Sequence, residues 1–324
     1  FTFRAKDPTL SSHAATVVVL VGIAAEAGTL SPNTPKYPLK TASRLYTQQQ
    51  IDQARALCAS DPAAAAILAT LEKNAAYWVT KTDEELRALL PDWRVPRSFN
   101  DSINGCPVHG KDIFKHGTYP WKLDREHPFT ITCPEGGETY PSNDFAAYYA
   151  SNFTDHTLLT GQYVDPGRGW LAPDNEKRWM VGYAVHWNWR NTWIPAVGTL
   201  AKAFALTGNT AYARKAIAML DRIAELYPSM THALQSRYGE LQNGNYKGKL
   251  VNAIWETGIL QDLAVAYDLV FPALVGAGAL DLPWRAAPEV RKNIEANLLE
   301  EGIDSVGTAE IRGNFGMHQN ALVY

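Results

Sequence analysis

Apolar residues recur at helical spacing along most of this sequence, and that periodicity limits the folds that the chain can adopt. Between Thr210 and Tyr227, apolar positions follow one another at intervals of three or four residues, which places them on one face of a helix. The same pattern predicts helices in these further segments: 47–59, 62–78, 83–90, 196–207, 250–270, 288–299 and 313–323.

Short turns that carry helix-stopping and helix-starting residues join these segments. Gly208 provides a helix stop, Asn209 begins a polar cap, and Pro62 stands at a helix start. Helices joined by such turns pack as antiparallel hairpins. We therefore expect an all-α fold over residues 39–324, either a bundle or an incomplete α/α toroid.

The stretch 91–173 interrupts this pattern. It is rich in glycine, proline and aromatic residues and shows little helical periodicity. Its most distinctive runs are GCPVHG (105–110), TYPWK (118–122), TCPEGGETYPSND (132–144) and DPGRGW (165–170). Because irregular segments of this length are uncommon inside compact domains, we expect a long functional insertion here.

The N-terminus has the features of an export signal. Arg4 and Lys6 form a basic region, residues 14–25 are apolar, and Ala25 and Ala27 flank a cleavage-site pattern. Residues 1–27 are thus expected to be a signal peptide, followed by a proline-rich linker at 28–38, in a secreted or periplasmic protein. The alternative interpretation of the apolar run is a buried strand.

The charge distribution excludes some partners. The formal net charge is −3, and no run of lysine and arginine suggests a nucleic-acid-binding surface. An acidic polysaccharide remains a suitable partner, because only the binding cleft needs positive charge. Outside the N-terminal run, no segment approaches the ~20 apolar residues of a membrane span.

Two short motifs around cysteines resemble the knuckles of a zinc ribbon. Cys106 and His109 form the first, and Cys133 begins the second, which has Gly136 where a second ligand is expected. A structural zinc held by Cys106, His109 and Cys133, with Glu138 or water as the fourth ligand, is one interpretation. A Cys106–Cys133 disulfide and two free thiols are the others. The first two require the sulfur atoms to be close, and an imidazole facing both would favour zinc.

The order of the motifs from Cys106 onward, ending with HWNWRNTW (186–193), NAIWETGILQDLAVAYDLV (252–270) and RGNFGMHQNA (312–321), resembles the heparinase II/III-like polysaccharide lyases. The resemblance implies an incomplete α/α toroid followed by a β-sandwich. It also implies β-elimination of a uronate polysaccharide of the alginate, glycosaminoglycan or ulvan type, with no cofactor required for catalysis. The family's catalytic tyrosine and second histidine would then lie downstream of Tyr324, so the chain is expected to be a C-terminally truncated catalytic domain.

The resemblance also identifies candidate catalytic residues. Removal of the C5 proton beside a uronate carboxylate requires a group that neutralises or hydrogen-bonds this carboxylate. Asn314 matches the family's asparagine motif, and His318 follows one helical turn later as a base or a second contact to the carboxylate. Gln319 and Asn320 are candidate sugar contacts. The alternative is that Asn314 caps a helix and His318 lies on the surface.

The tryptophan-rich run is a second candidate site. Flat aromatic faces suit sugar rings, and Arg190 could bind a carboxylate or sulfate with two hydrogen bonds. The candidate substrate-binding residues are His186, Trp187, Trp189, Arg190, Trp193 and Glu256. Packing of the aromatics in a helical core, with Arg190 in an ion pair, is the alternative, and Glu256 could equally be paired with an arginine.

Two other classes of function compete with the lyase. A glycoside hydrolase on an α/α barrel would need two carboxylates that flank a cleft, and the chain could also be a non-catalytic polysaccharide-binding protein. Ultraviolet absorbance of the product separates elimination from hydrolysis, because only elimination leaves a C4=C5 double bond conjugated to the carboxylate.

Overall fold

A computed structural model of the chain describes residues 2–3, 15–16, 33–231, 248–251, 253–312 and 316. The predicted helix at 313–323 and most of the predicted signal peptide and linker lie outside these residues. The chain divides into two units, 1–31 and 32–324. In the first unit, β1 (Thr2–Phe3) pairs with β2 (Ala15–Thr16) in antiparallel fashion.

The second unit is mostly helical, as predicted. The chain is 55% helical and 6% strand, and the described strands form no closed sheet. The main helices are α1 (Gln48–Ser60), α2 (Pro62–Thr80), α3 (Asp83–Leu89), α4 (Phe145–Ala150), α5 (Met180–Asn188), α6 (Ile194–Thr207), α7 (Thr210–Leu226), α8 (Ala253–Val270), α9 (Ala287–Ile294) and α10 (Glu301–Gly307).

Side-chain caps set several of the predicted helix ends. Thr47 and Gln50 form a reciprocal capping box at the start of α1. The Asp61 carboxylate accepts a hydrogen bond at the start of α2, where Pro62 occupies the first turn. Gly208, with φ of 73°, ends α6 in the left-handed conformation that glycine adopts without strain.

The helix predicted at 196–207 extends much further toward the N-terminus in the structure. The tryptophan-rich run lies within one continuous helical stretch of α5, the π-helix η3 (Trp189–Trp193) and α6. In η3, the Ile194 N–H bonds to the Trp189 carbonyl five residues back. Pro195 follows and lacks a backbone N–H, so it cannot donate a hydrogen bond within the helix. The wider π-turn allows the helix to continue through this position, although proline usually stands in the first turn of a helix.

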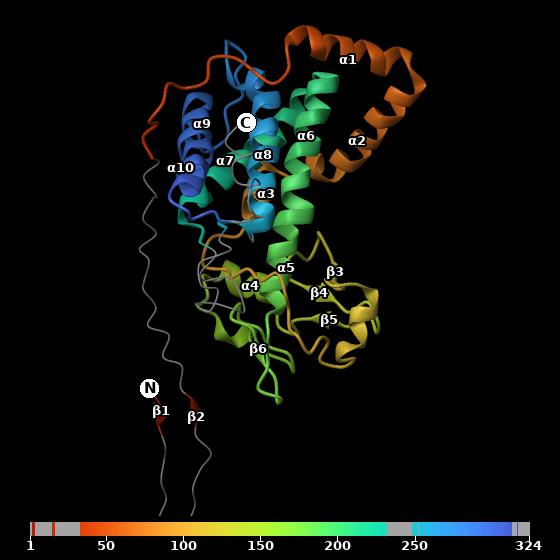
Figure 1. The fold of residues 1–324 in the computed structure, drawn as a ribbon, viewed down its shortest axis with the longest axis vertical. Coiled ribbons are helices and arrows are strands. Elements are labelled where there is room, and N and C mark those ends of the chain that lie inside the picture. The colour runs from red at the N-terminus through yellow and green to blue at the C-terminus, as the bar shows by residue number, and fades with distance from the viewer. Residues whose placement is uncertain are drawn as a thin grey trace, which may run out of the picture. The chain divides into compact units, whose positions relative to one another are not determined.

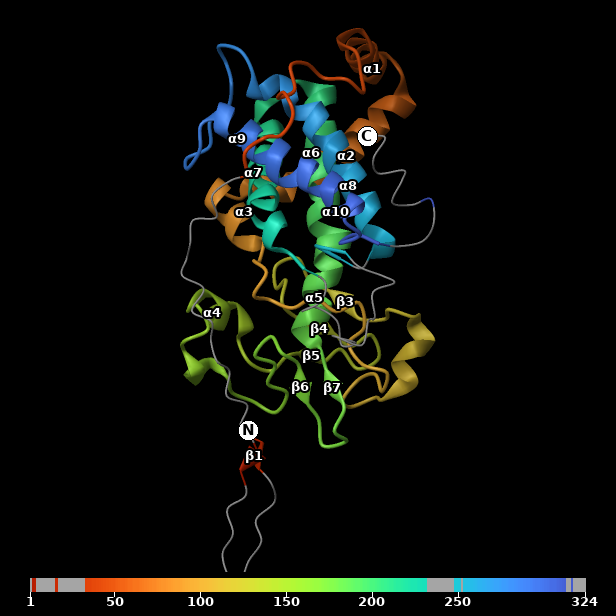
Figure 2. The ribbon, with the colours of Figure 1, turned by 60° about the vertical axis from the view of Figure 1, so that its left-hand side comes forward.

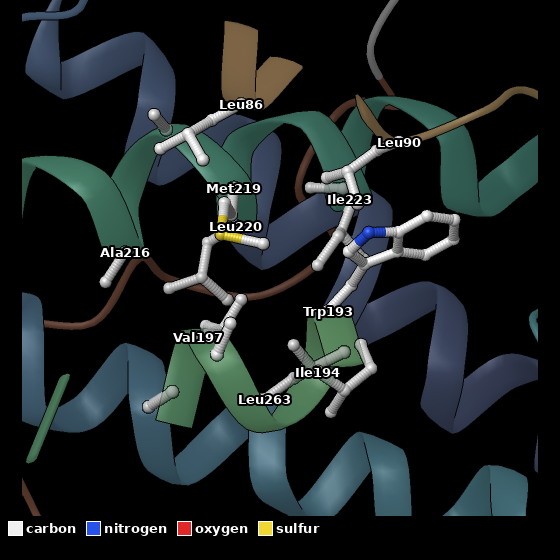
Figure 3. Packing of buried hydrophobic residues seen from close by; sticks show 14 of the residues in the cluster. Leu86, Leu90, Trp193, Ile194, Val197, Ala216, Met219, Leu220, Ile223 and Leu263 are labelled. Carbon is white, nitrogen blue, oxygen red and sulfur yellow. The ribbon is translucent and has the colours of Figure 1, made fainter. Parts of the chain in front are cut away.

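Helix α6 lies at the centre of the helical region. It packs against α2, α7 and α8, an arrangement visible in Figures 1 and 2. Figure 3 shows Ile194 and Val197 of α6 meeting Leu220 and Ile223 of α7, with Leu263 of α8 nearby. All five side chains are nearly inaccessible to solvent, so their packing supplies much of the hydrophobic stabilisation.

Helix α8 and the short helix that follows it form a long apolar stretch. The stretch Trp255–Leu274, which includes the 3₁₀-helix η7 (Phe271–Leu274), is long and apolar enough to cross a membrane. However, 67% of that stretch is buried inside the protein. Burial of this kind is typical of a core helix and accounts for its composition without a membrane.

The insertion at 91–173 contains more regular structure than expected. The strands β3 (Lys122–Leu123), β4 (Ile131–Thr132) and β5 (Thr139–Tyr140) form an antiparallel sheet, and β6 (Trp170–Leu171) pairs with β7 (Lys177–Arg178). Short 3₁₀-helices η1 (Lys111–His116) and η2 (His156–Leu158) also lie here. β3 and β4 contact α5, and Figure 2 shows α5 running among these strands.

A buried aspartate from the DPGRGW run fixes the start of α5. The Asp165 carboxylate is fully buried and accepts hydrogen bonds from the backbone N–H groups of Gly167, Gly169 and Val181 at 2.8, 2.8 and 3.0 Å. Burial raises the pKa of this carboxyl group, and the hydrogen bonds oppose that rise. One side chain therefore orders the loop and caps α5.

We expect Asp165→Asn to lower the free energy of unfolding by about 1–3 kcal/mol, because an amide N–H₂ would face backbone donors. Chemical denaturation measures the change. Asp155→Asn is the control, since Asp155 is exposed and holds only a surface turn, and it should alter stability by about 0.5 kcal/mol at most. Equal midpoints for the two variants would contradict the role of Asp165.

Candidate functional site: an aromatic–arginine cluster and a Cys–His–Glu cluster

The tryptophans of the HWNWRNTW run lie on two different sides of the helix. Trp189 and Trp193 are 0% and 1% exposed and contact each other with ring centroids 5.0 Å apart in the main core. The prediction that these two residues bind sugar is therefore not supported by their position. Their burial follows from the helix, because positions four apart share a face and this face packs in the main core.

The other side of the same helix carries Trp187 and Arg190. Trp255 of α8 and Tyr119 of the insertion join them there. The Arg190 guanidinium carbon is 5.5 Å from the Trp187 ring centroid and 4.9 Å from that of Trp255. The Tyr119 ring centroid is 4.5 Å from that of Trp187 and 6.2 Å from that of Trp255. Tyr119, Trp187, Arg190 and Trp255 are called the aromatic–arginine cluster below.

The charge of Arg190 has no acidic partner within the described part of the chain. Its one hydrogen bond to a described residue runs from Nη1 to the Asn191 Oδ1 atom at 3.0 Å, and no described carboxylate lies within ion-pair distance. Cation–π contact with the two indole rings stabilises the position of the guanidinium. Tyr119 is 38% exposed and Arg190 is partly exposed, so this cluster presents aromatic faces and a positive charge to solvent.

His186 and Glu256, both predicted substrate contacts, are fully buried. The His186 ring packs against Trp187 and Trp255. The Glu256 carboxylate accepts hydrogen bonds from the backbone N–H groups of Leu250 and Val251 and from the Tyr227 hydroxyl. Burial raises the pKa of Glu256, and these hydrogen bonds oppose that rise. The structure thus gives Glu256 a supporting position beneath the start of α8 in place of a surface contact.

The predicted catalytic residues Asn314 and His318, and the predicted sugar contacts Gln319 and Asn320, lie outside the described residues and stay predictions. Tyr119 and Trp255 were not predicted as part of a site. Both stood in runs noted for their composition, but nothing in the sequence indicates that TYPWK would fold back onto α5 and α8.

The second cluster joins the two cysteine motifs. One ligand atom from each of Cys106, His109, Cys133 and Glu138 lies within 4.8 Å of the others. The His109 Nδ1 atom is 3.7 Å from the Cys106 sulfur, 3.6 Å from the Cys133 sulfur and 3.5 Å from the Glu138 Oε2 atom. Both cysteines are free in the structure, so the Cys106–Cys133 disulfide, one of the three interpretations of these motifs, is not formed. Their predicted proximity is confirmed.

Each cysteine begins a small closed loop. Cys106 and Gly110 exchange two backbone hydrogen bonds, and the Cys133 N–H donates to the Glu138 carbonyl at 2.8 Å. The Val108 N–H points at the Cys106 sulfur at 3.4 Å, and the N–H groups of Glu135 and Gly136 point at the Cys133 sulfur. Backbone donors aimed at sulfur stabilise a thiolate.

Both sulfur-bearing side chains are buried. Burial raises the pKa of the Cys133 thiol, the N–H groups of Gly136 and Glu135 oppose this rise, and Cys106 adds to it. Burial and a hydrogen bond with the Cys106 sulfur raise the pKa of the Tyr140 hydroxyl. The Glu138 Oε2 atom is buried, and no described N–H or O–H group donates to it. A metal ion is a partner that would satisfy the two sulfurs, the imidazole nitrogen and this carboxylate oxygen together.

A comparison of the chain with protein-family models, with characterised proteins and with solved structures gives no match. The candidate sites therefore rest on the residues and their geometry.

Truncation should have different effects in the main core and in the aromatic–arginine cluster. Trp189→Ala should lower the free energy of unfolding by about 3–5 kcal/mol, because it leaves a cavity in the core. Tyr119→Ala removes a partly exposed ring and should cost about 1 kcal/mol. Urea denaturation measures both, and a small loss for Trp189→Ala would reopen its assignment as a sugar contact.

Proposed function

We propose that this protein binds an acidic, uronate-containing polysaccharide at the aromatic–arginine cluster and cleaves it by β-elimination. The observation that supports the binding step is Arg190, an arginine without a described acidic partner, whose guanidinium lies over the rings of Trp187 and Trp255. Arginines beside carboxylates usually form ion pairs, whereas Arg190 has no such partner within the described part of the chain and lies beside flat aromatic faces.

The cluster matches the two chemical features of a uronate sugar. A pyranose ring has an apolar C–H face, which packs on an aromatic ring such as that of Tyr119. The carboxylate at C5 is planar, and a guanidinium binds it with two parallel hydrogen bonds. Neutral sugars offer the first feature alone, so the guanidinium favours an acidic polymer such as alginate, a glycosaminoglycan or ulvan.

Elimination rests on the sequence motifs. In the proposed reaction a base removes the C5 proton, an acid protonates the C4 oxygen, and the C4–O bond breaks to leave a C4=C5 double bond. Asn314 would hydrogen-bond the uronate carboxylate as charge moves onto it, and His318 would act as the base or as a second contact. The chemistry requires no cofactor.

The resemblance to heparinase II/III-like lyases and the helical hairpins also support two wider proposals. We infer that the helical region is part of an incomplete α/α toroid, whose concave side would hold the polymer. We also infer that residues 1–27 direct export, because a polymeric substrate of this kind is met outside the cytoplasm.

The reaction class can be tested on the purified full-length protein with alginate, chondroitin, heparin and ulvan as substrates. An ultraviolet-absorbing product would support β-elimination. New reducing ends without this absorbance would identify a hydrolase, and retention on an immobilised polymer without any product would identify a binding protein. Either of these outcomes would overturn the lyase proposal.

Arg190→Ala should weaken binding of the acidic polymer roughly 10–100-fold, because a hydrogen bond to a charged group contributes about 1.5–3 kcal/mol. In the active enzyme this loss should raise KM more than it lowers kcat. Added salt should weaken the wild type more than the variant. Affinity electrophoresis in gels that contain the polymer measures the binding.

Arg125→Ala is the matched control, since Arg125 is exposed and its guanidinium also stacks on an aromatic ring, that of Tyr77, at 4.1 Å. This variant should bind as the wild type does. Equal losses for Arg190→Ala and Arg125→Ala would show that binding follows general charge, and the cluster would no longer be the binding surface.

A further inference from the structure

We propose that Cys106, His109, Cys133 and Glu138 bind one zinc ion that fastens the insertion together. The four side chains come from two loops. Cys133 in the second loop is 24 residues after His109 in the first. Two thiolates, an imidazole and a carboxylate are donors that zinc accepts, and four protein ligands are typical of a structural site.

The distances from the His109 Nδ1 atom to the other three donor atoms fit a tetrahedral zinc ion. With Zn–S bonds of ~2.3 Å and Zn–N bonds of ~2.0–2.1 Å, tetrahedral angles place sulfur and nitrogen ~3.6 Å apart. The two observed distances from His109 Nδ1 to sulfur are 3.7 and 3.6 Å. For nitrogen and a carboxylate oxygen the expected separation is ~3.4 Å, and the observed His109–Glu138 distance is 3.5 Å.

Hydrogen bonding alone does not account for this arrangement. His109 Nδ1 faces the Cys106 sulfur, the Cys133 sulfur and the Glu138 Oε2 atom at similar distances. A ring nitrogen carries at most one proton, so it can serve only one of the three acceptors well. A metal ion at the centre would engage all four groups at once and would neutralise the thiolates.

Gly136 explains how the fourth ligand comes from position 138. In a zinc knuckle the second ligand normally stands three residues after the first, and Gly136 occupies that place after Cys133. A β-carbon on Gly136 would lie 2.2 Å from the His109 ring and 2.4 Å from a Glu138 carboxylate oxygen. The Glu138 carboxylate thus fills the space that a side chain at 136 would occupy, and it does so only because that residue is glycine.

The ion would hold a small core in place. Cys106 and Cys133 are buried in a second hydrophobic cluster with Ile131, Tyr140 and Trp187. Through Trp187 this second core reaches α5 and the aromatic–arginine cluster. Because the strands around the site are only two residues long, they contribute few backbone hydrogen bonds, and a metal link across the two loops would stabilise the region substantially.

The first experiment measures zinc in the purified full chain by elemental analysis and then exchanges the zinc for cobalt. We expect about one zinc per chain, as for a closed four-ligand site, and sulfur-to-cobalt charge-transfer absorption with the bands of tetrahedral cobalt. Chelation of the metal should increase backbone hydrogen exchange in 105–140 more than in α6 and α7. Less than about a tenth of an ion per chain, together with no cobalt uptake, would overturn the proposal.

Each ligand has a matched control in the chain. We expect Cys133→Ser, His109→Ala and Glu138→Gln to weaken zinc binding at least about tenfold in competition with a chromophoric chelator. Cys58→Ser, His116→Ala and Glu135→Gln change the same residue types outside the cluster and should keep wild-type affinity. Equal losses in ligand and control variants would overturn the assignment, and circular dichroism verifies that each variant is folded.

Glycine variants test the position of the fourth ligand independently. Gly136→Ala should weaken zinc binding roughly 10–100-fold, because its methyl group would displace Glu138 and His109. The backbone at Gly136 is one that alanine can adopt, as is that of Gly278, which has open space around it. Gly278→Ala is therefore the control and should bind zinc normally. Normal zinc binding by Gly136→Ala would contradict a zinc site. So would a Cys106–Cys133 disulfide in the purified protein, which mass spectrometry would detect as the loss of two hydrogen atoms.

Discussion

The continuous helix from Met180 to Thr207 is the constraint on which the rest of the described structure depends. Its second half, α6, is surrounded by α2, α7 and α8, while its first half, α5, packs on the short strands of the insertion. The Asp165 carboxylate fixes where this helix begins, and the π-turn at η3 allows it to pass Pro195 without a break. A single rigid element therefore belongs to both hydrophobic cores, and it sets the orientation of every side chain between them.

Because this helix contributes to both cores, the aromatic residues of one short run lie in two different environments. Trp189 and Trp193 lie on the face that closes the main core, whereas Trp187 and Arg190 lie on the face that meets Tyr119 and Trp255. In a straight α-helix the apolar stripe shifts gradually around the axis, and a π-turn advances that shift by a further residue. The aromatic residues of the run thus include both core residues and residues nearer the surface. The amino-acid composition alone does not distinguish the two kinds.

Local chemistry made the helix ends predictable. Thr47, Asp61, Gly208 and Asn209 act through hydrogen bonds and backbone conformations within a few residues of themselves, and the sequence displays all of that information. The proximity of Cys106 and Cys133 was predictable for a related reason, because a shared metal ion and a disulfide both require the two sulfur atoms to be close. The place of Tyr119, the burial of Glu256 and the continuity of α5 with α6 depend on contacts between segments far apart in sequence, and no local pattern encodes these contacts.

The two clusters are physically connected, and this connection bears on what a structural metal would do for a binding surface. Trp187 packs in the same small core as both cysteines, and its outer face supports Arg190 and contacts Tyr119. A guanidinium binds a carboxylate selectively only if its plane is fixed beforehand, since an arginine that must first be ordered loses part of the gain to side-chain entropy. Rigid indole rings provide that order, and their own rigidity depends on the small core beneath them. A site that locks the two cysteine loops would therefore contribute to recognition without touching the polymer, as supporting residues do for the groups that bind a ligand directly.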